Sequence, residues 1–405
     1  MLVFGLVFAF SLILWQVKRN ISIGLAVTLG GVVLAIFAGF TPLEIMMTIL
    51  ETFTQKNTIQ LIATVTLVNI LSSMMSEYGI MNLMVEYLEK AFKRIDALLF
   101  IIPSLLSTFT ASGAAIIAAP IIDGLGNRVG ISAAKKAAIN LYVRHAWYFI
   151  LPVSVNLINA SFISNIPIKK LVIAQAPISI ICLTTAYLVY LYPLRKFSDL
   201  EEEKVENDEF ELDTFLKAFL YTSPILICVF LVFFIPSYLA LLAGSILAYI
   251  IRVKKTPLSN IIFNKKGMPL IIAAAGVMIF KNFIENIPEL KILLEQIINL
   301  GIPLEVIIIL MTIIASYVAA NLTVVIGLMY PLILPIVPQE QLIPTATLIY
   351  TMGYATYFIS PIHLCQALTN EYFGVAMKDL YKEYRITVPV MYVTSLITNF
   401  FIRFI

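Results

Sequence analysis

The sequence predicts an all-α polytopic membrane protein with two inverted-topology repeats, each with a re-entrant helical hairpin and a broken transmembrane helix. Of its 405 residues, 60% are hydrophobic and only 13% are charged, about half the charged share of soluble domains. Uncharged runs recur along the chain, and each approaches or exceeds the roughly 20 apolar residues of a bilayer-spanning helix. A third observation is a polar pattern that occurs once in each half.

This repeated pattern has two parts with matched spacing. The first part is two small polar residues followed by a proline, and its copies are Thr110, Ser112 and Pro120, then Asn321, Thr323 and Pro331. The second part is Tyr-Phe-Ile-x-Pro, which ends at Pro152 and again at Pro361. The offsets are 211 and 209 residues (321 − 110 and 361 − 152), so one small indel separates the copies. Duplicated polar breaks inside apolar helices are typical of secondary transporters built from two related halves.

The apolar runs predict six spans in each half of the chain. They are expected near 2–17, 21–40, 58–77, 97–109, 137–163 and 171–194, then near 215–234, 237–251, 268–285, 303–318, 341–373 and 386–403. The extra apolar pieces at 112–125 and 323–336 are too short to cross a bilayer, which favours re-entrant hairpins. Amphipathic segments at 81–93 and 289–298 are typical of interfacial helices.

The predicted organisation is two repeats and a linker. The first repeat is 1–197, with a hairpin at about 97–125 and a broken helix at about 137–163; the second is 214–405, with a hairpin at about 303–336 and a broken helix at about 341–373. Between them, residues 198–213 are rich in Glu and predict a solvated cytoplasmic linker.

The distribution of Lys and Arg predicts the orientation. Of the 27 such residues, 20 lie in or beside the loops at 18–20, 78–96, 126–136, 195–213, 252–267 and 374–385, six lie on the opposite side, and Arg144 lies inside a span. The positive-inside rule therefore places these six loops in the cytoplasm. The first hairpin then enters from the cytoplasm and the second from outside. This charge distribution gives no indication of nucleic-acid binding.

The hairpin tips are the first candidate binding residues. Thr110, Ser112 and Gly113 in one half, and Asn321 and Thr323 in the other, can break a helix and offer hydroxyl or amide groups. Helix N-termini that begin there would direct N–H groups at an anion, and opposing carbonyls could hold Na⁺. The alternative is that these small residues only permit close helix packing.

The proline breaks supply the second set of candidates. Polar residues surround them: Ser154, Asn156, Ser360, His363, Thr369 and Asn370. A proline in a span frees a carbonyl, although a simple kink would need no binding role. Arg144 and His145 precede the first break, where Arg144 could contact an anion or extend toward the cytoplasmic surface. His363 could couple protons or remain a neutral core residue.

Other residue types exclude several classes of protein. No catalytic motif is present, so an enzyme is not predicted, and no Walker loop indicates ATP use. The three cysteines, Cys182, Cys228 and Cys365, lie in apolar runs without metal-ligand spacing, and are predicted to be small buried hydrophobes. Neither a cofactor nor a metal is predicted, apart from Na⁺ as a coupling ion.

Two motifs resemble a known family. They are the Arg-His-x-Trp motif at 144–147 and the Ser-Pro-x-His-Leu-Cys motif at 360–365, which is followed by Leu-Thr-x-Glu-Tyr-Phe at 368–373. The chain resembles an uncharacterised family of prokaryotic integral membrane proteins in the ion transporter superfamily, related to gluconate, citrate, C4-dicarboxylate and lactate permeases. The resemblance implies a homodimer in the cytoplasmic membrane and an elevator-like motion. Those permeases carry Ser-Asn-Thr at the tips, where this chain has Thr-Ala-Ser-Gly and Asn-Leu-Thr.

The function that the sequence predicts is cation-coupled secondary transport, driven by Na⁺ or H⁺, of a small organic anion such as a carboxylate. One rival is a Na⁺/H⁺ antiporter or an inorganic-anion transporter on the same fold, although mid-span Asp and Glu are scarce. A second rival is a membrane scaffold protein that transports nothing, in which the tips would be filled by apolar packing.

Overall fold

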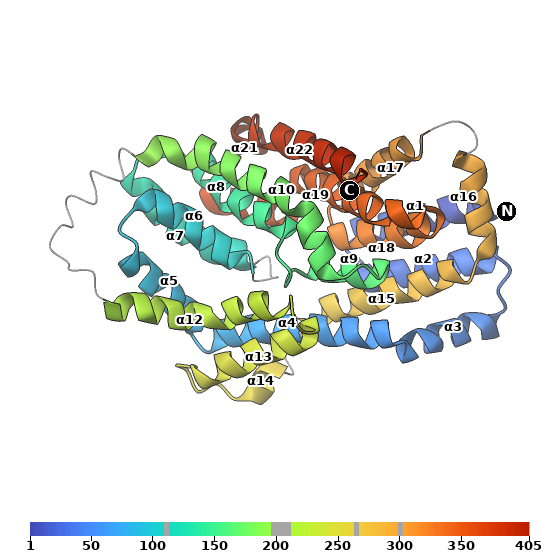
Figure 1. The fold of residues 1–405 in the computed structure, drawn as a ribbon, viewed down its shortest axis with the longest axis horizontal. Helices are drawn as coiled ribbons and strands as arrows, with labels where there is room; N and C mark the ends of the chain where they lie inside the picture. The colour runs from blue at the N-terminus through green and yellow to red at the C-terminus, as the bar shows by residue number, and fades with distance from the viewer. Residues whose placement is uncertain (109–112, 196–211, 263–266, 299–302, 405) are drawn as a thin grey trace.

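The computed structural model describes residues 1–108, 113–195, 212–262, 267–298 and 303–404, and every regular element in these ranges is a helix (Figure 1). The first half contains α1 (Leu2–Lys18), α2 (Ile23–Phe37), α3 (Pro42–Thr54), α4 (Lys56–Glu77), α5 (Ile80–Ala91), α6 (Ile95–Leu106), α7 (Gly113–Arg128), α8 (Ala133–Ala146), η1 (Trp147–Phe149), α9 (Val155–Ser164), α10 (Ile168–Ala186), η2 (Tyr187–Leu191) and η3 (Tyr192–Leu194). The second half contains α12 (Leu212–Leu231), α13 (Ser237–Ile250), α14 (Leu258–Ile262), α15 (Met268–Glu285), α16 (Pro288–Ile298), α17 (Leu304–Ala319), α18 (Leu322–Ile333), η5 (Leu334–Ile336), η6 (Gln339–Gln341), α19 (Leu342–Ile359), α20 (Leu364–Phe373), α21 (Met377–Glu383) and α22 (Thr387–Ile402).

Several described helices have the length and apolarity of membrane spans. These are α4, α10 with its continuation to Leu194, α12 and α15. Helices α21 and α22 form a further apolar pair, bent by 58° at the break between them. Most other predicted spans correspond to apolar helices of 10–17 residues. The fold is therefore all-α, and its long apolar helices indicate a multi-pass membrane protein.

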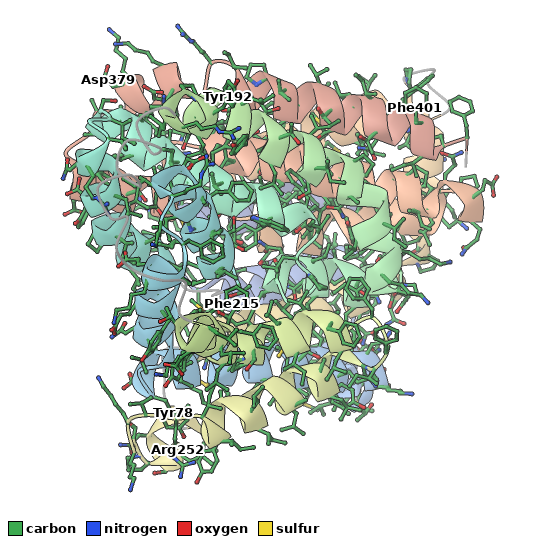
Figure 2. The ribbon with its side chains drawn as sticks, turned by 60° about the vertical axis from the view of Figure 1, so that its left-hand side comes forward. Tyr78, Tyr192, Phe215, Arg252, Asp379 and Phe401 are labelled. Atoms are coloured by element: carbon green, nitrogen blue, oxygen red, sulfur yellow. The ribbon has the colours of Figure 1, made fainter. Side chains whose placement is uncertain are left out.

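The outer surface of the bundle is apolar, as a bilayer requires. Tyr192, Phe215 and Phe401, labelled in Figure 2, are 55%, 42% and 60% exposed. A soluble protein rarely exposes so many large apolar side chains, and such surfaces mark contact with lipid or partner chains.

Some predicted spans are longer than the helices observed. The span expected at 21–40 is α2, which has 15 residues and is followed by Gly39 at a φ of 91°. By contrast, the span expected at 237–251 agrees with α13 (Ser237–Ile250) to within one residue. Because an uncharged run includes the apolar residues of adjoining turns, its length overestimates that of the helix.

Helix α3 lies where the sequence analysis expects only a connection between spans. A capping box begins it: the Glu44 backbone N–H donates to Thr41 Oγ1 at 3.3 Å, and the Thr41 N–H donates to Glu44 Oε2 at 2.7 Å. Pro42 occupies the first helical position, where its missing N–H is not needed. The sequence Thr-Pro-Leu-Glu is thus a helix-start signal, although this helix lies outside the predicted apolar spans.

The two halves of the chain pack most closely where α2 meets α15. A side chain added at Gly276 would lie 2.3 Å from the Gly24 carbonyl oxygen, and one at Gly24 would lie 2.0 Å from the Ile272 carbonyl oxygen. Small residues at such a crossing let helix backbones approach, which is a common means of association in membranes. This contact fixes the position of the first half against the second.

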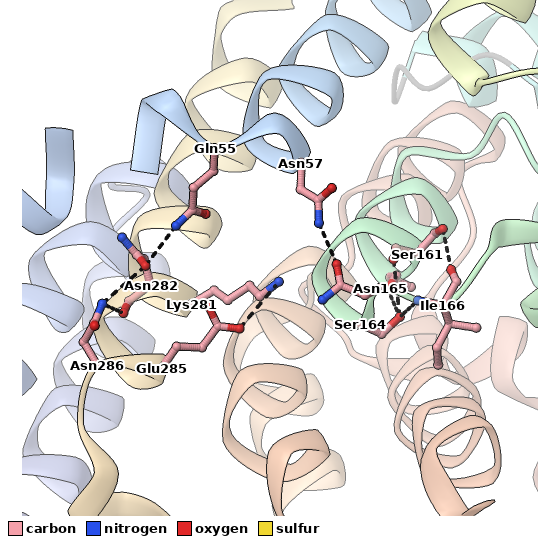
Figure 3. Close-up of polar contacts among 11 residues, drawn as sticks. Gln55, Asn57, Ser161, Ser164, Asn165, Ile166, Lys281, Asn282, Glu285 and Asn286 are labelled. Carbon is pink, nitrogen blue, oxygen red and sulfur yellow. Dashed lines mark hydrogen bonds and ion pairs between the residues drawn. The ribbon is translucent and has the colours of Figure 1, made fainter. Parts of the chain in front are cut away.

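Polar side chains reinforce this side of the bundle (Figure 3). Asn282 on α15 accepts from Gln55 Nε2 at 3.1 Å and donates to Thr52 Oγ1 at 3.0 Å. The side chains of Asn57 and Asn165, at the start of α4 and the end of α9, are hydrogen-bonded at 2.6 Å. These bonds tie α3, α4 and α9 together with α15 across the two halves of the chain.

We predict that Gly276→Val destabilises the protein by about 1–3 kcal/mol, because overpacking forces the helices apart. The measurement is the unfolding temperature of the purified protein in detergent. The matched control is Gly124→Ala on α7, where a side chain would meet nothing within 4 Å. An unfolding temperature unchanged in Gly276→Val would contradict the close α2–α15 contact.

Candidate functional site

The helix that begins with α8 is interrupted at Pro152. Helix α8 ends at Ala146, η1 follows, and α9 begins at Val155 with Ser154 as its N-cap. Proline removes a backbone N–H, and its ring crowds the carbonyl of the preceding turn, so it favours a break or kink in a helix. Tyr350 on α19 satisfies part of the exposed backbone, since its phenol donates to the Tyr148 carbonyl at 2.9 Å.

The helix that begins with α19 is interrupted in the same way at Pro361. Helix α19 ends at Ile359, and α20 begins at Leu364 with His363 as its N-cap. The Ser360 hydroxyl donates to the Tyr317 carbonyl near the end of α17, at 2.9 Å. At the break itself, the Tyr381 hydroxyl of α21 donates to the Ile359 carbonyl at 2.7 Å. The backbone at each interruption is therefore satisfied in part by a tyrosine hydroxyl from another helix.

The break between α17 and α18 brings polar groups from both halves together. Ala320 has a φ of 45°, and Asn321 caps α18 by accepting from the Thr323 N–H at 2.9 Å. The Thr323 hydroxyl donates to Asn156 Oδ1 of α9 at 2.9 Å. Because Thr323 and Asn156 lie in the first turns of their helices, the N-termini of α18 and α9 converge. Both ends carry partial positive charge, which favours an anion.

The two histidines meet between the interrupted helices. The rings of His145, at the end of α8, and His363, at the start of α20, are 5.1 Å apart between centroids. Tyr357 lies beside them, with its ring centroid 4.1 Å from that of His363. Both histidines are 1% exposed. The structure thus brings together two residues that are 218 positions apart in the sequence.

Arg144 is buried and does not extend to the surface. It is 1% exposed, and its Nε and Nη2 atoms have no hydrogen-bond partner in the described ranges. The phenols of Tyr148, Tyr354 and Tyr357 lie within electrostatic reach of the guanidinium. This arrangement rules out the alternative in which Arg144 snorkels to the cytoplasmic face. A buried cation with unused donors has the chemistry of an anion contact.

The remaining candidates are dispersed. Thr369 accepts from Asn140 Nδ2 at 3.5 Å, which joins α20 to α8, and Asn370 donates to the Met377 sulfur at 3.5 Å, farther along α20. These two positions therefore do not face the bond between α18 and α9. Gly113 is the first residue of α7, whereas Thr110 and Ser112 lie outside the described residues, as does most of the predicted linker.

Two groups at these breaks were missed by the sequence analysis. Tyr350 holds the first break through its hydroxyl, although a tyrosine inside an uncharged run gives no signal of that role. Cys365 was treated as a buried hydrophobe, but it is only half-buried and its sulfur lies beside both histidines. Cys365 follows His363 by two positions in the sequence, but the proximity of His145 to these two residues depends on the fold.

Comparison with known proteins places the chain in a family. It matches the family described as "Protein of unknown function (DUF401)" over residues 3–402. The chain belongs to this family. The match covers both halves and every helix of the site described above. No curated protein matches the chain.

We predict that Thr323 and Asn156 are energetically coupled through their hydrogen bond. In a double-mutant cycle with Thr323→Val and Asn156→Leu, the coupling energy should be about 0.5–1 kcal/mol, a typical value for hydrogen bonds between membrane helices. Unfolding in detergent measures it. Ser395→Ala is the control, because the Ser395 hydroxyl bonds only the Met391 carbonyl of its own helix. Purely additive effects of the first pair would show that the two helix starts do not contact each other.

Proposed function

We propose that the protein is a cation-coupled secondary transporter of a small organic anion, with a carboxylate as the expected class. It would work by alternating access of the elevator type, as a homodimer in a prokaryotic cytoplasmic membrane. Two inverted repeats would supply the two alternating states.

The observation that carries the proposal is a reciprocal packing of the two halves. Within each half, the first hairpin arm packs on the helix before the proline break, α6 on α8 and α17 on α19. Between halves, the second arm packs on the helix after the other break, α18 on α9 and α7 on α20. Each of these two kinds of contact is thus made twice, with the halves exchanged, as expected for two related repeats around a shared site.

Positive potential at the breaks supports an anionic substrate. The N-termini of α9 and α18 meet through the Thr323–Asn156 bond, and Arg144 lies buried before the first break with two unused donor atoms. A carboxylate could accept from Arg144 with two parallel hydrogen bonds, which is the geometry a guanidinium favours. Without an anion, and with no hydrogen-bond partner for its Nε and Nη2 atoms among the described residues, Arg144 is a buried charge that is unfavourable for folding.

The pairing of Asp96 and Asp123 with basic residues favours anion transport over antiport. Asp96 on α6 is 2% exposed, but Arg94 holds it with two bonds of 2.9 and 3.1 Å. Asp123 on α7 is held by Lys136 at 2.7 Å. A cation/proton antiporter needs an acid that exchanges its ion during the cycle. Both carboxylates instead serve as partners of fixed basic residues.

The first test is an uptake screen in proteoliposomes. We expect accumulation of at least one labelled mono-, di- or tricarboxylate when an inward Na⁺ or proton gradient is imposed, and none without a gradient. Vesicles lacking the protein are the control. If no carboxylate accumulates in vesicles whose protein content and orientation are verified, the substrate assignment is wrong. Cation-evoked proton movement without organic substrate would favour the antiporter.

We predict that Arg144→Met weakens substrate affinity by roughly 10–100-fold, the loss of a charge-assisted contact of about 1.5–3 kcal/mol. Its unfolding temperature should equal or exceed that of the wild type, because an uncompensated buried charge is removed. Lys281→Met is the matched control: Lys281 is 6% exposed and lies 3.7 Å from Glu285 on α15, away from the breaks. Uptake should be unchanged in this control. A destabilised Arg144→Met protein with unaltered affinity would assign Arg144 a structural role.

A further inference from the structure

Three metal-ligating side chains converge between the interrupted helices. The Sγ atom of Cys365 and one ring nitrogen each of His145 and His363 all lie within 4.8 Å of one another. They come from separate positions: the end of α8, the N-cap of α20 and the first turn of α20. The histidines are buried, and Cys365 is half-buried.

Both histidines are oriented in the way that metal ligands are. His145 Nδ1 lies 2.7 Å from the Leu141 carbonyl oxygen, and His363 Nδ1 lies 3.3 Å from the Phe358 carbonyl oxygen. Because a carbonyl only accepts, each neutral ring carries its proton on Nδ1 and leaves the Nε2 lone pair available. His363 Nε2 is buried and has no hydrogen-bond partner in the described ranges. An orphaned lone pair of this kind indicates an absent ligand.

We propose that His145, His363 and Cys365 form a transition-metal site of the Zn²⁺ or Cu⁺ type. Ligands at about 2.0–2.3 Å in tetrahedral geometry are separated by about 3.3–3.8 Å. In this structure the three ligand atoms lie within 4.8 Å of one another, so the separations would have to shorten by about 1 Å. Small side-chain rotations can supply this change. Imidazole with thiolate selects soft or borderline metals, whereas Na⁺ and Mg²⁺ prefer oxygen ligands.

The charge at the site determines how the metal is held. As the sulfur–metal bond forms, the Cys365 thiol gives its proton to water, and the thiolate offsets one positive charge of the metal. Arg144 lies within electrostatic reach of Cys365. A dication would therefore need an anion, such as hydroxide or a carboxylate, in the fourth position, which the three protein ligands leave open. Binding would join α8 to α20 and hold the two proline breaks together.

The experiment is a Co²⁺ titration of the reduced, chelator-treated full chain in detergent. We expect one equivalent per chain with a thiolate-to-cobalt charge-transfer band that Zn²⁺ displaces. Cys365→Ser should abolish this band, and His145→Gln should weaken binding at least tenfold. The double variant Cys182→Ser/Cys228→Ser is the control, because these two thiols are buried elsewhere, and it should bind as the wild type does.

Three results would overturn the proposal: no charge-transfer band in the wild type, a band that persists in Cys365→Ser, or a band lost in the control. The unfolding temperature of each variant, measured without metal, separates loss of a ligand from loss of the fold. No substrate or gradient is used in the titration. The titration therefore tests the metal site independently of the proposed transport, which the uptake assay tests.

Discussion

An interrupted helix inside an apolar bundle leaves backbone groups without partners, and satisfying them is the constraint on which this structure depends. Each proline break is satisfied in part from another element: Tyr350 bonds the backbone at the first, and Tyr381 bonds the backbone at the second. The break before α18 is capped by Asn321, and Thr323 reaches across to Asn156. Because no water is present in a bilayer core, the breaks must gather and supply one another with partners. Their proximity follows from this requirement.

The packing of the broken helices against one another also buries polar groups that lack hydrogen-bond partners in the part of the chain that the structure describes. The functional proposals rest on these groups. Among the described residues, Arg144 has donors and His363 has an acceptor without hydrogen-bond partners, although both side chains are 1% exposed. Buried groups of this kind destabilise a protein unless a ligand completes them. A stable core would have replaced them with apolar side chains. The anion and metal proposals each assign a ligand to such groups, and both lie where two helices are broken.

Sequence reasoning could predict the breaks and their polar residues, because Pro152 and Pro361 interrupt helices by local chemistry and the motif around them is duplicated. It could not give the contacts between them, since the approach of His145 to His363, or Thr323 to Asn156, depends on how distant helices pack. Helix lengths were overestimated where apolar turns adjoin a helix. The metal ligand Cys365 was missed because sequence spacing alone cannot show a third ligand 220 residues away (365 − 145).

The central claim is that the halves have opposite orientations and place their broken helices against one another. Sidedness of labelling tests it most directly. In a chain lacking its three native cysteines, single cysteines are introduced at Ala133, the first residue of α8, and at Gln339, before α19, which are both exposed. A membrane-impermeant thiol reagent applied to one side of the bilayer should label only one of the two positions, and the other position only from the opposite side. Labelling of both from the same side would contradict the account.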